Sequence, residues 1–297
     1  MNRLFLVLFA ALHGHLMVAQ TDAPGKIKLP EELPEVSGLY YASQDSLWWH
    51  NDSGDQPRLI LTDETGTLLH ELKLPIQHKD WEDITTDDRG NIYIGDFGNN
   101  ANARQDLRIY IMNPRTQALH SILFTYPDQV AFPPPSPRAN FDMEGFFWFR
   151  DSLHLFSKNR LRAGNGFTKH YVLPARAGRY TAELRDSIYL PDRVVTAATI
   201  SPDGQTVALL SYFYNRILNF IPKSRTTIWT FSNFEGTAFF RGDLSKKAVR
   251  NGPAPSQFES IDFIDNQRVY VASERVPFYK QQAKLVKLKK VKRVNKP

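Results

Sequence analysis

Three glutamates stand in the same short sequence context, and together they could build one site for a hard metal ion. The contexts are Trp81-Glu82-Asp83-Ile84, Met143-Glu144-Gly145-Phe146 and Phe258-Glu259-Ser260-Ile261. Carboxylates that crowd together raise one another's pKa or recruit a cation. With Asn and Asp oxygens nearby they suit calcium or magnesium. The chain has no cysteine and no histidine pair at ligand spacing, which disfavours zinc.

The same step recurs twice without the glutamate, as Val36-Ser37-Gly38-Leu39 and Thr196-Ala197-Ala198-Thr199. In all five units a second apolar strand follows nine or ten residues later, at 47–49, 92–94, 153–155, 207–209 and 269–271. Turn sequences such as Ser201-Pro202-Asp203-Gly204 separate the two strands, as in hairpins. A constant inner hairpin with variable outer parts is typical of a β-propeller.

The sequence therefore predicts an all-β fold, a single β-propeller over residues 26–290. Five blades are expected from the five units, while six stay open if 122–138 or 216–241 holds a degenerate blade. The last unit supplies three strands, at 262–264, 268–272 and 283–288. The segment 26–29 is expected to add the fourth strand and close the ring.

A propeller places the start of each innermost strand and the end of each second strand on the same face. Glu82, Glu144 and Glu259 should therefore meet at the mouth of the central channel, where we expect a calcium ion or another divalent cation. Two structural alternatives remain open. Each glutamate could accept backbone N–H bonds from the neighbouring blade, or pair with Lys158, Arg275 or Arg104.

The N-terminus has the pattern of a secretory signal peptide over residues 1–20. A positive start at Asn2-Arg3 precedes an apolar stretch at 4–12, and a cleavage site is expected near Ala19 or Gln20. No later segment reaches about 18 apolar residues, so no transmembrane anchor is expected. Without cysteine there is neither a lipobox nor a disulfide. The sequence predicts a secreted or periplasmic protein.

The net charge of +6 comes from the C-terminal end of the chain. Eight basic and no acidic residues occur from Lys280 to Pro297, which leaves about −2 for the rest. We expect a basic tail at 291–297 and no nucleic-acid-binding face. Contact of this tail with an acidic polymer or membrane surface is the alternative to a merely solvated end.

Aromatic and serine residues give weaker indications. Trp48, Trp49, Trp81 and Trp148 are expected in the core between blades, with a sugar-stacking surface as the alternative. His78 is expected at the surface, although it could serve as a general base. Ser157, Ser211 and Ser273 have no His and Asp at a spacing that would indicate a serine nucleophile.

One stretch carries a family resemblance. Residues 36–39, Trp49-His50-Asn51-Asp52-Ser53-Gly54, Asp80-Trp81-Glu82-Asp83-Ile84 and Tyr93-Ile94-Gly95-Asp96-Phe97-Gly98-Asn99-Asn100 resemble secreted, largely uncharacterised β-propeller proteins of Bacteroidetes-type bacteria. More distantly, the chain is similar to esterase-like phytase and gluconolactonase-like propellers. That resemblance implies a divalent cation at the channel mouth for ester, lactone or phosphoester hydrolysis. It implies Glu82, Glu144 and Glu259 as ligands, with Asn51 and Asp96 in support.

Two functions follow from these patterns. The first is an exported binding or scaffold propeller with a calcium-stabilised mouth, whose partner is a small molecule, a glycan or a cell-envelope protein. The second is a metal-dependent hydrolase, in which Asp83, Glu274 or His50 would accept the proton. A monomer is expected in either case.

Overall fold

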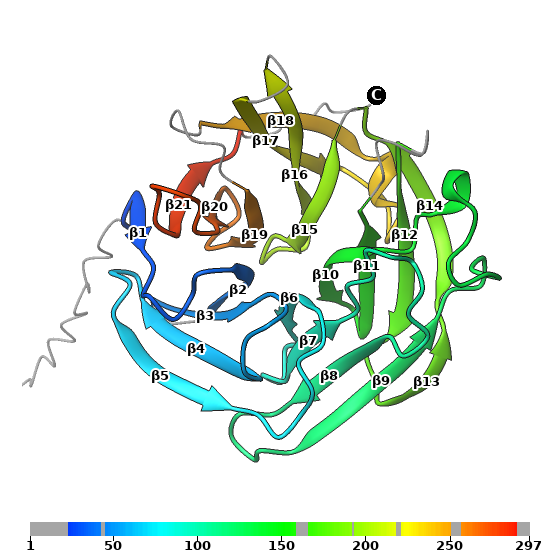
Figure 1. Cartoon of the computed structure of the whole chain (residues 1–297), viewed down its shortest axis with the longest axis horizontal. Helices are drawn as coiled ribbons and strands as arrows, with labels where there is room; N and C mark the ends of the chain where they lie inside the picture. Colours follow the sequence, from blue (N-terminus) through cyan, green and yellow to red (C-terminus); the bar gives the residue numbers. More distant parts are fainter. Residues whose placement is uncertain are drawn as a thin grey trace, which may run out of the picture.

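Five β-sheets, antiparallel except for one edge strand, radiate from a common axis, and their innermost strands together surround that axis (Figure 1). The protein is described by a computed structural model that covers residues 23–42, 45–158, 166–191, 193–217, 221–250 and 257–289. Four innermost strands begin at the first residue of a repeated step, and β15 begins two residues before its step. The prediction of an all-β, five-bladed β-propeller is therefore confirmed.

The blades are numbered here in chain order, each from its innermost strand outward. Blade 1 contains β2 (Val36–Ala42), β3 (Ser46–Asn51), β4 (Arg58–Asp63) and β5 (Leu68–Lys73). Blade 2 contains β6 (Trp81–Thr86), β7 (Ile92–Asp96), β8 (Arg108–Met112), β9 (Leu119–Thr125) and, at its edge, β13 (Gly178–Thr181). Blade 3 contains β10 (Met143–Phe149), β11 (Ser152–Ser157), β12 (Phe167–Pro174) and β14 (Glu183–Tyr189).

Blades 4 and 5 complete the ring. Blade 4 contains β15 (Val194–Ile200), β16 (Thr206–Ile217), β17 (Ile221–Ser232) and β18 (Asp243–Val249). Blade 5 contains β19 (Phe258–Phe263), β20 (Arg268–Ser273), β21 (Gln282–Lys287) and β1 (Lys26–Lys28). Two short 3-10 helices, η1 (Ser136–Arg138) and η3 (Phe239–Arg241), lie in the connections.

The ring is closed by the N-terminal strand, as predicted. β1 pairs antiparallel with β21, and this places Ile27 opposite Ala283 with both side chains fully buried. On the inner side, each innermost strand contacts the next around the axis, and β19 contacts β2. Closure joins the two ends of the described chain in one sheet, in which β1 is the outermost strand.

The alternative of six blades is wrong in the described part of the chain. The first segment considered for it, 122–138, runs from β9 through a loop to η1, and the second, 216–241, lies largely in β17 and η3. The unexpected element is β13, which leaves blade 3 and pairs in parallel with β9, Tyr180 opposite Phe124. Blade 2 thereby gains a fifth strand, and the two blades are tied together.

Apolar side chains fill the spaces between neighbouring blades. Trp49 lies in the cluster between blades 5 and 1, and Trp81 in the cluster between blades 1 and 2. Trp48 packs against the second of these clusters, and Trp148 packs against the cluster between blades 2 and 3. All four tryptophans therefore serve as inter-blade core, as predicted. Alternate residues of a strand point to opposite faces of its blade, and each face packs against a neighbouring blade.

Polar side chains near the axis link the blades to one another. The carboxyl group of Asp262 on β19 accepts hydrogen bonds from the backbone N–H of Tyr41 at 2.8 Å and from the Thr199 hydroxyl at 2.6 Å. The backbone N–H of Phe263 donates a third bond at 2.9 Å. Burial outweighs these bonds and raises the pKa of Asp262 to about 6. One carboxyl group thus connects blades 1, 4 and 5.

We expect the free energy of unfolding of the wild type, measured relative to that of Asp262→Asn, to decrease as the pH rises from 4 to 6. A folded-state pKa above the unfolded value of about 4 means that the folded protein binds the proton more tightly. The stabilisation is complete below the unfolded-state pKa and is lost as the pH rises through the folded-state pKa of about 6. For this partly exposed carboxyl group the loss should be about 1–2 kcal/mol. Urea unfolding of both proteins in EDTA across this range measures it, and parallel pH curves would contradict it.

Two predicted segments lie outside the described residues: the signal peptide at 1–20 and the basic tail at 291–297. Within the described residues, no helix has both the length and the apolar character needed to cross a membrane.

Candidate functional site

The repeated step of each blade is a β-bulge. The pairing of every innermost strand with its neighbour shifts at the same place, between residues 36 and 38, 81 and 84, 143 and 145, 195 and 197, and 258 and 260. The residues passed over are Ser37, Glu82 with Asp83, Glu144, Thr196 and Glu259. A bulge redirects the side chain of the extra residue and often lies beside a functional site. The glutamates are thus set apart from the regular ladder.

In the two blades without glutamate, the bulged residue is a link between blades. The Ser37 hydroxyl donates to the backbone oxygen of Glu82 at 2.6 Å. The Thr196 hydroxyl donates to the backbone oxygen of Phe258 at 3.1 Å. These two positions therefore hold the ring together, while acidic side chains occupy the other three.

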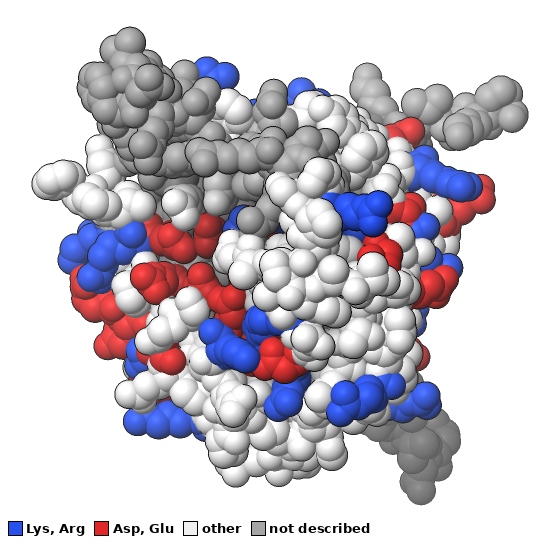
Figure 2. All heavy atoms as spheres, turned by 45° about the vertical axis from the view of Figure 1, so that its right-hand side comes forward, with Lys and Arg blue, Asp and Glu red and all other residues white. Residues whose placement is uncertain are grey.

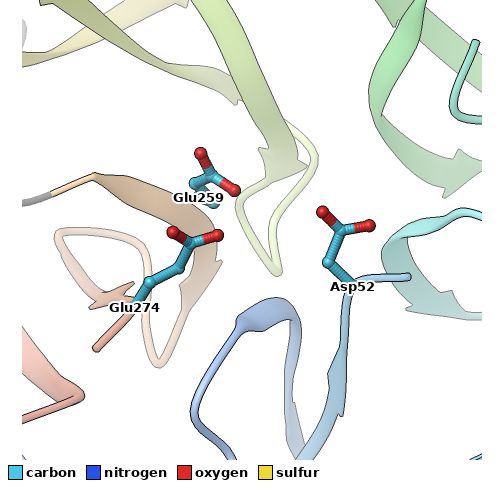
Figure 3. Close-up of side chains that lie close together, drawn as sticks. All are labelled: Asp52, Glu259 and Glu274. Atoms are coloured by element: carbon cyan, nitrogen blue, oxygen red, sulfur yellow. The ribbon is translucent and has the colours of Figure 1, made fainter. Parts of the chain in front are cut away.

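Two groups of three carboxylates, together called the acidic mouth here, lie in or next to the two inner strands of blades 1, 2 and 5 and share Asp52. Within each group the ligand oxygens lie within 4.8 Å of one another. One group joins Asp52 to Glu259 and Glu274, and Figure 3 shows these three carboxylates facing a common space from blades 1 and 5. The other joins Asp52 to Asp80 and Glu82. Figure 2 shows a dense group of acidic side chains at the left of the view, with lysine and arginine beside it, and smaller acidic groups at the right.

Local backbone bonds fix these residues. Asp52 follows β3, and its backbone N–H donates to the Glu35 oxygen at 2.8 Å. Glu274 follows β20 and donates to the Gln257 oxygen at 3.2 Å. The Gln257 side-chain amide in turn donates to the carboxylates of Glu259 at 3.1 Å and Glu274 at 3.4 Å. The Asp52–Glu259–Glu274 group is therefore braced from its blade 5 side.

Gly98 allows the second group to form. A Cβ atom at this position would lie 2.0 Å from the Glu82 Oε1 atom and 2.5 Å from the Asp80 Oδ2 atom. The backbone N–H of Gly98 donates to the Asp80 backbone oxygen at 3.2 Å. Only a residue without a side chain leaves room for both carboxylates here.

Crowding and burial shift the ionisation of these groups. Burial raises the pKa of Asp80 to about 6. Burial, and then the neighbouring carboxyl of Glu259, raise the pKa of Glu274 to about 10. Burial and the charge of Glu144 raise the pKa of Glu82 well above its usual value. A divalent cation would offset the repulsion and favour the charged forms.

Glu144 takes a different role, which corresponds to one of the structural alternatives. The Lys158 Nζ atom lies 2.7 Å from the Glu144 Oε1 atom, with side-chain exposures of 20% and 3%. Burial disfavours the ammonium form, but the charge of Glu144 and of other nearby acidic groups raises the pKa of Lys158 well above its usual value. The other two cations considered bind elsewhere: Arg104 pairs with Asp96, and Arg275 with Glu31.

The two supporting ligands implied by the resemblance, Asn51 and Asp96, lie in braced loops. The Asn51 amide donates to the Glu32 oxygen at 2.8 Å and to an Asp55 carboxylate oxygen at 2.6 Å. Its own oxygen accepts the Glu35 N–H. Asp96 accepts hydrogen bonds from the Arg104 guanidinium and from a backbone N–H. Neither residue belongs to the two acidic groups that the structure brings together, and their role as ligands stays a prediction.

Of the three residues suggested as proton acceptors, Glu274 lies in the acidic mouth. Asp83 is buried, and its two oxygens accept backbone N–H bonds from Ile84 at 2.9 Å, Phe146 at 3.1 Å and Ala198 at 3.4 Å. It thus joins three innermost strands.

His50 is buried beneath the mouth, with its ring over Gly38. Its Nδ1 atom lies 2.8 Å from the Asn51 oxygen, and its ring meets that of Trp81 edge-on at a centroid separation of 5.6 Å. Burial lowers the pKa of His50 to about 4. His78 is part-exposed and lies 4.2 Å from the Trp81 ring, centroid to centroid.

Asp52 and Asp80 are the residues that sequence reasoning missed. Both lie within the stretches that carry the resemblance, one residue after Asn51 and two residues before Glu82. A pattern signal was present, because Asn51 is followed by an acidic residue and Glu82 has acidic residues on both sides within two positions. The sequence pattern could not say which neighbour faces the axis.

Comparison with known proteins gives similarity of fold. No family model matches the chain, and no curated protein matches it. Similar solved structures include hydrazine synthase of Kuenenia stuttgartiensis, at 14% identity and a TM-score of 0.41, covering 88% of this chain and 65% of that chain. This chain therefore spans less than two thirds of that relative.

Two other similar structures have comparable identities. A catalytically inactive virginiamycin B lyase from Staphylococcus aureus has 14% identity and a TM-score of 0.39, covering 87% of this chain and 68% of the lyase. MPT-4, a mannose phosphorylase from Leishmania mexicana, has 13% identity and a TM-score of 0.49, covering 89% of this chain and 88% of the phosphorylase. At these identities the similarity concerns fold alone.

Proposed function

We propose that this protein is an exported β-propeller that binds a divalent cation, calcium by preference, in its acidic channel mouth and uses it to hold a ligand. The observation that carries the proposal is Glu82. The residue is 4% exposed and belongs to one of the two groups that share Asp52. Among the described residues, no side chain forms a hydrogen bond or ion pair with its carboxylate. A largely buried carboxylate without such a partner is costly in its charged form unless a cation offsets that charge.

The donor set supports calcium over softer metals. Both groups consist of carboxylates only, and hard oxygen ligands favour calcium or magnesium. Calcium accepts six to eight ligands in irregular geometry, whereas magnesium requires a nearly regular octahedron. A site assembled from bulged strands and adjoining loops of three blades suits the less demanding ion.

Thermal unfolding with EDTA and with calcium tests the proposal. At a calcium concentration about 100 times the Kd, binding should stabilise the fold by about 2.7 kcal/mol, which corresponds to a rise in Tm of roughly 5–10 °C. Asp52→Asn should remove most of this rise, because Asp52 belongs to both groups. Asp151→Asn is the control, since this side chain is 81% exposed in the turn between β10 and β11. A Tm that responds to neither addition would refute the cation site.

A second function, metal-dependent hydrolysis, is favoured by the partial exposure of Asp52, Asp80 and Glu274. A cation held beside these side chains could keep positions open for water and substrate, polarise a carbonyl or phosphoryl oxygen and lower the pKa of the bound water. Glu274 is the best placed of the three suggested proton acceptors, because Asp83 and His50 are buried. Calcium-dependent turnover on an ester, lactone and phosphoester panel that Asp52→Asn removes together with the calcium-induced Tm rise would establish the enzyme. Lower turnover of Glu274→Gln at saturating calcium would support the role of Glu274. Calcium binding without turnover would favour the binding module.

A further inference from the structure

A cavity of about 670 Å³ opens beside the second acidic group. Asp80 belongs both to that group and to the cavity wall, so the two are continuous. The rest of the wall comes from Lys79 and from the loop after β7, residues 99–106. A hollow of this volume has room for a small-molecule ligand, one face of which would stay in contact with solvent.

The loop that forms the wall is held rigid by its own buried asparagines. The Asn99 oxygen accepts the N–H groups of Ala103 and Arg104 at 2.8 and 2.9 Å, while its amide donates to the Phe141 oxygen. The Asn102 amide donates to the Asn99 backbone oxygen at 3.1 Å. The Arg104 guanidinium binds the Gly98 backbone oxygen at 2.9 Å. A wall fixed in advance loses little entropy when a ligand binds.

Neutral hydrogen-bonding groups on this wall are available to a ligand. The side chains of Asn100 and Gln105 are exposed, and neither amide has a hydrogen-bond partner among the described residues. Each amide offers donors and an acceptor, which is the complement of a hydroxyl group. The exposed methyl groups of Ala101 and Ala103 add small apolar surfaces between them.

The charges of the cavity argue against an anionic ligand. Lys79 pairs with Asp106 at 2.6 Å, and Arg104 pairs with Asp96 and Asp106, so the cations of the wall are already neutralised. Asp80 adds a negative charge at the inner end, and the other acidic groups of the mouth lie beyond it. A divalent ion bound by three carboxylates would still leave one negative charge. The cavity therefore favours a neutral ligand rich in hydroxyl groups.

We propose that this cavity binds a neutral carbohydrate, with Asn100 and Gln105 bonding its hydroxyl groups and the ring packed on the alanine methyls. The inference rests on the proposed function in one respect: at the inner end of the cavity, hydroxyl groups of the sugar would reach the cation held beside Asp80. The contacts with the loop do not depend on the cation.

A glycan array that contains neutral and acidic oligosaccharides, followed by calorimetry with the neutral glycan that binds most tightly, tests the inference. Asn100→Ala combined with Gln105→Ala should weaken binding by about tenfold or more, because two hydrogen bonds are lost. Gln205→Ala combined with Asn266→Ala is the matched control. Both of these amides are exposed, and they line a separate cavity at the turns after β15 and β19. The control should retain the wild-type affinity.

Calcium binding is measured separately, by calorimetry without glycan. An array with no bound glycan, or with acidic glycans alone, overturns the carbohydrate inference even if calcium binds. Neutral-glycan binding that the cavity double variant leaves unchanged overturns it as well. If glycan binds through the cavity while calcium does not bind, the proposed cation function fails and the carbohydrate site stands.

Discussion

Replacing Lys158 with methionine is expected to lower the free energy of unfolding by about 3–5 kcal/mol at neutral pH in EDTA, since it leaves a buried charge without its partner. Glu144 is 2% exposed, and the Lys158 ammonium lies 2.7 Å from its carboxylate. Methionine retains much of the aliphatic length of lysine, so the packing around the stem should change little. Urea unfolding of the two proteins under identical conditions measures the difference.

A second substitution separates loss of charge balance from loss of packing. In the Lys158→Met background, Glu144→Gln removes the unpaired charge and should recover most of the lost stability. Lys79→Met is the matched control, because Lys79 pairs with Asp106 on the surface at exposures of 53% and 46%. That change should cost less than about 1 kcal/mol. Equal effects of Lys158→Met and Lys79→Met would contradict a buried ion pair at the mouth.

The same ammonium explains why three converging glutamates do not form one symmetric ligand set. Lys158 neutralises Glu144 on the blade 3 side, and the remaining acidic groups gather around Asp52 on the side of blades 1, 2 and 5. The sequence pattern predicts convergence of Glu82, Glu144 and Glu259, and it leaves a lysine partner open. The choice among the three glutamates depends on the direction of the Lys158 side chain, which follows β11. The spacing of residues along the sequence does not determine that direction.

The fold was predictable because its main features are local and repeated. A hairpin offset of nine or ten residues recurs five times, and the ring follows from the repeat. The bulges were not predictable from the alternation of apolar and polar residues. An extra residue in one strand can be recognised only when that strand is compared with the strand it pairs with. The parallel pairing of β13 with β9 was also missed, because it joins segments from different blades without any local signal.

The site was predictable in position but less so in membership. Glu82, Glu259 and Glu274 were all suggested from their places at the ends of strands, and the structure brings them into the acidic groups. Asp52 and Asp80 lie just outside β3 and β6, where strand periodicity no longer determines the direction of a side chain. Sequence reasoning therefore located the mouth, and tertiary geometry was needed to identify Asp52 as the residue common to both groups.

Removing the Asp83 carboxyl group is expected to destabilise the ring itself. Asp83→Ala should lower the free energy of unfolding by about 3–5 kcal/mol, because it leaves the buried N–H groups of Phe146 and Ala198 without acceptors. Asp83→Asn retains one acceptor oxygen and should cost roughly 1–2 kcal/mol. We expect Asp83→Asn to be the more stable of the two variants. Burial raises the pKa of Asp83 well above its usual value and so favours an uncharged group at this position.

Urea unfolding of both Asp83 variants, with Asp151→Asn as an exposed control, measures this effect. If Asp83→Ala unfolds at the wild-type urea concentration, the bonds to β10 and β15 contribute little, and a chemical role for Asp83 becomes the better explanation of its position. If stability falls as expected, any loss of ligand binding or turnover in Asp83→Ala reports on the assembly of the mouth. Asp83→Asn then separates the two roles, since it preserves most of the ring while removing the ability of the group to accept a proton.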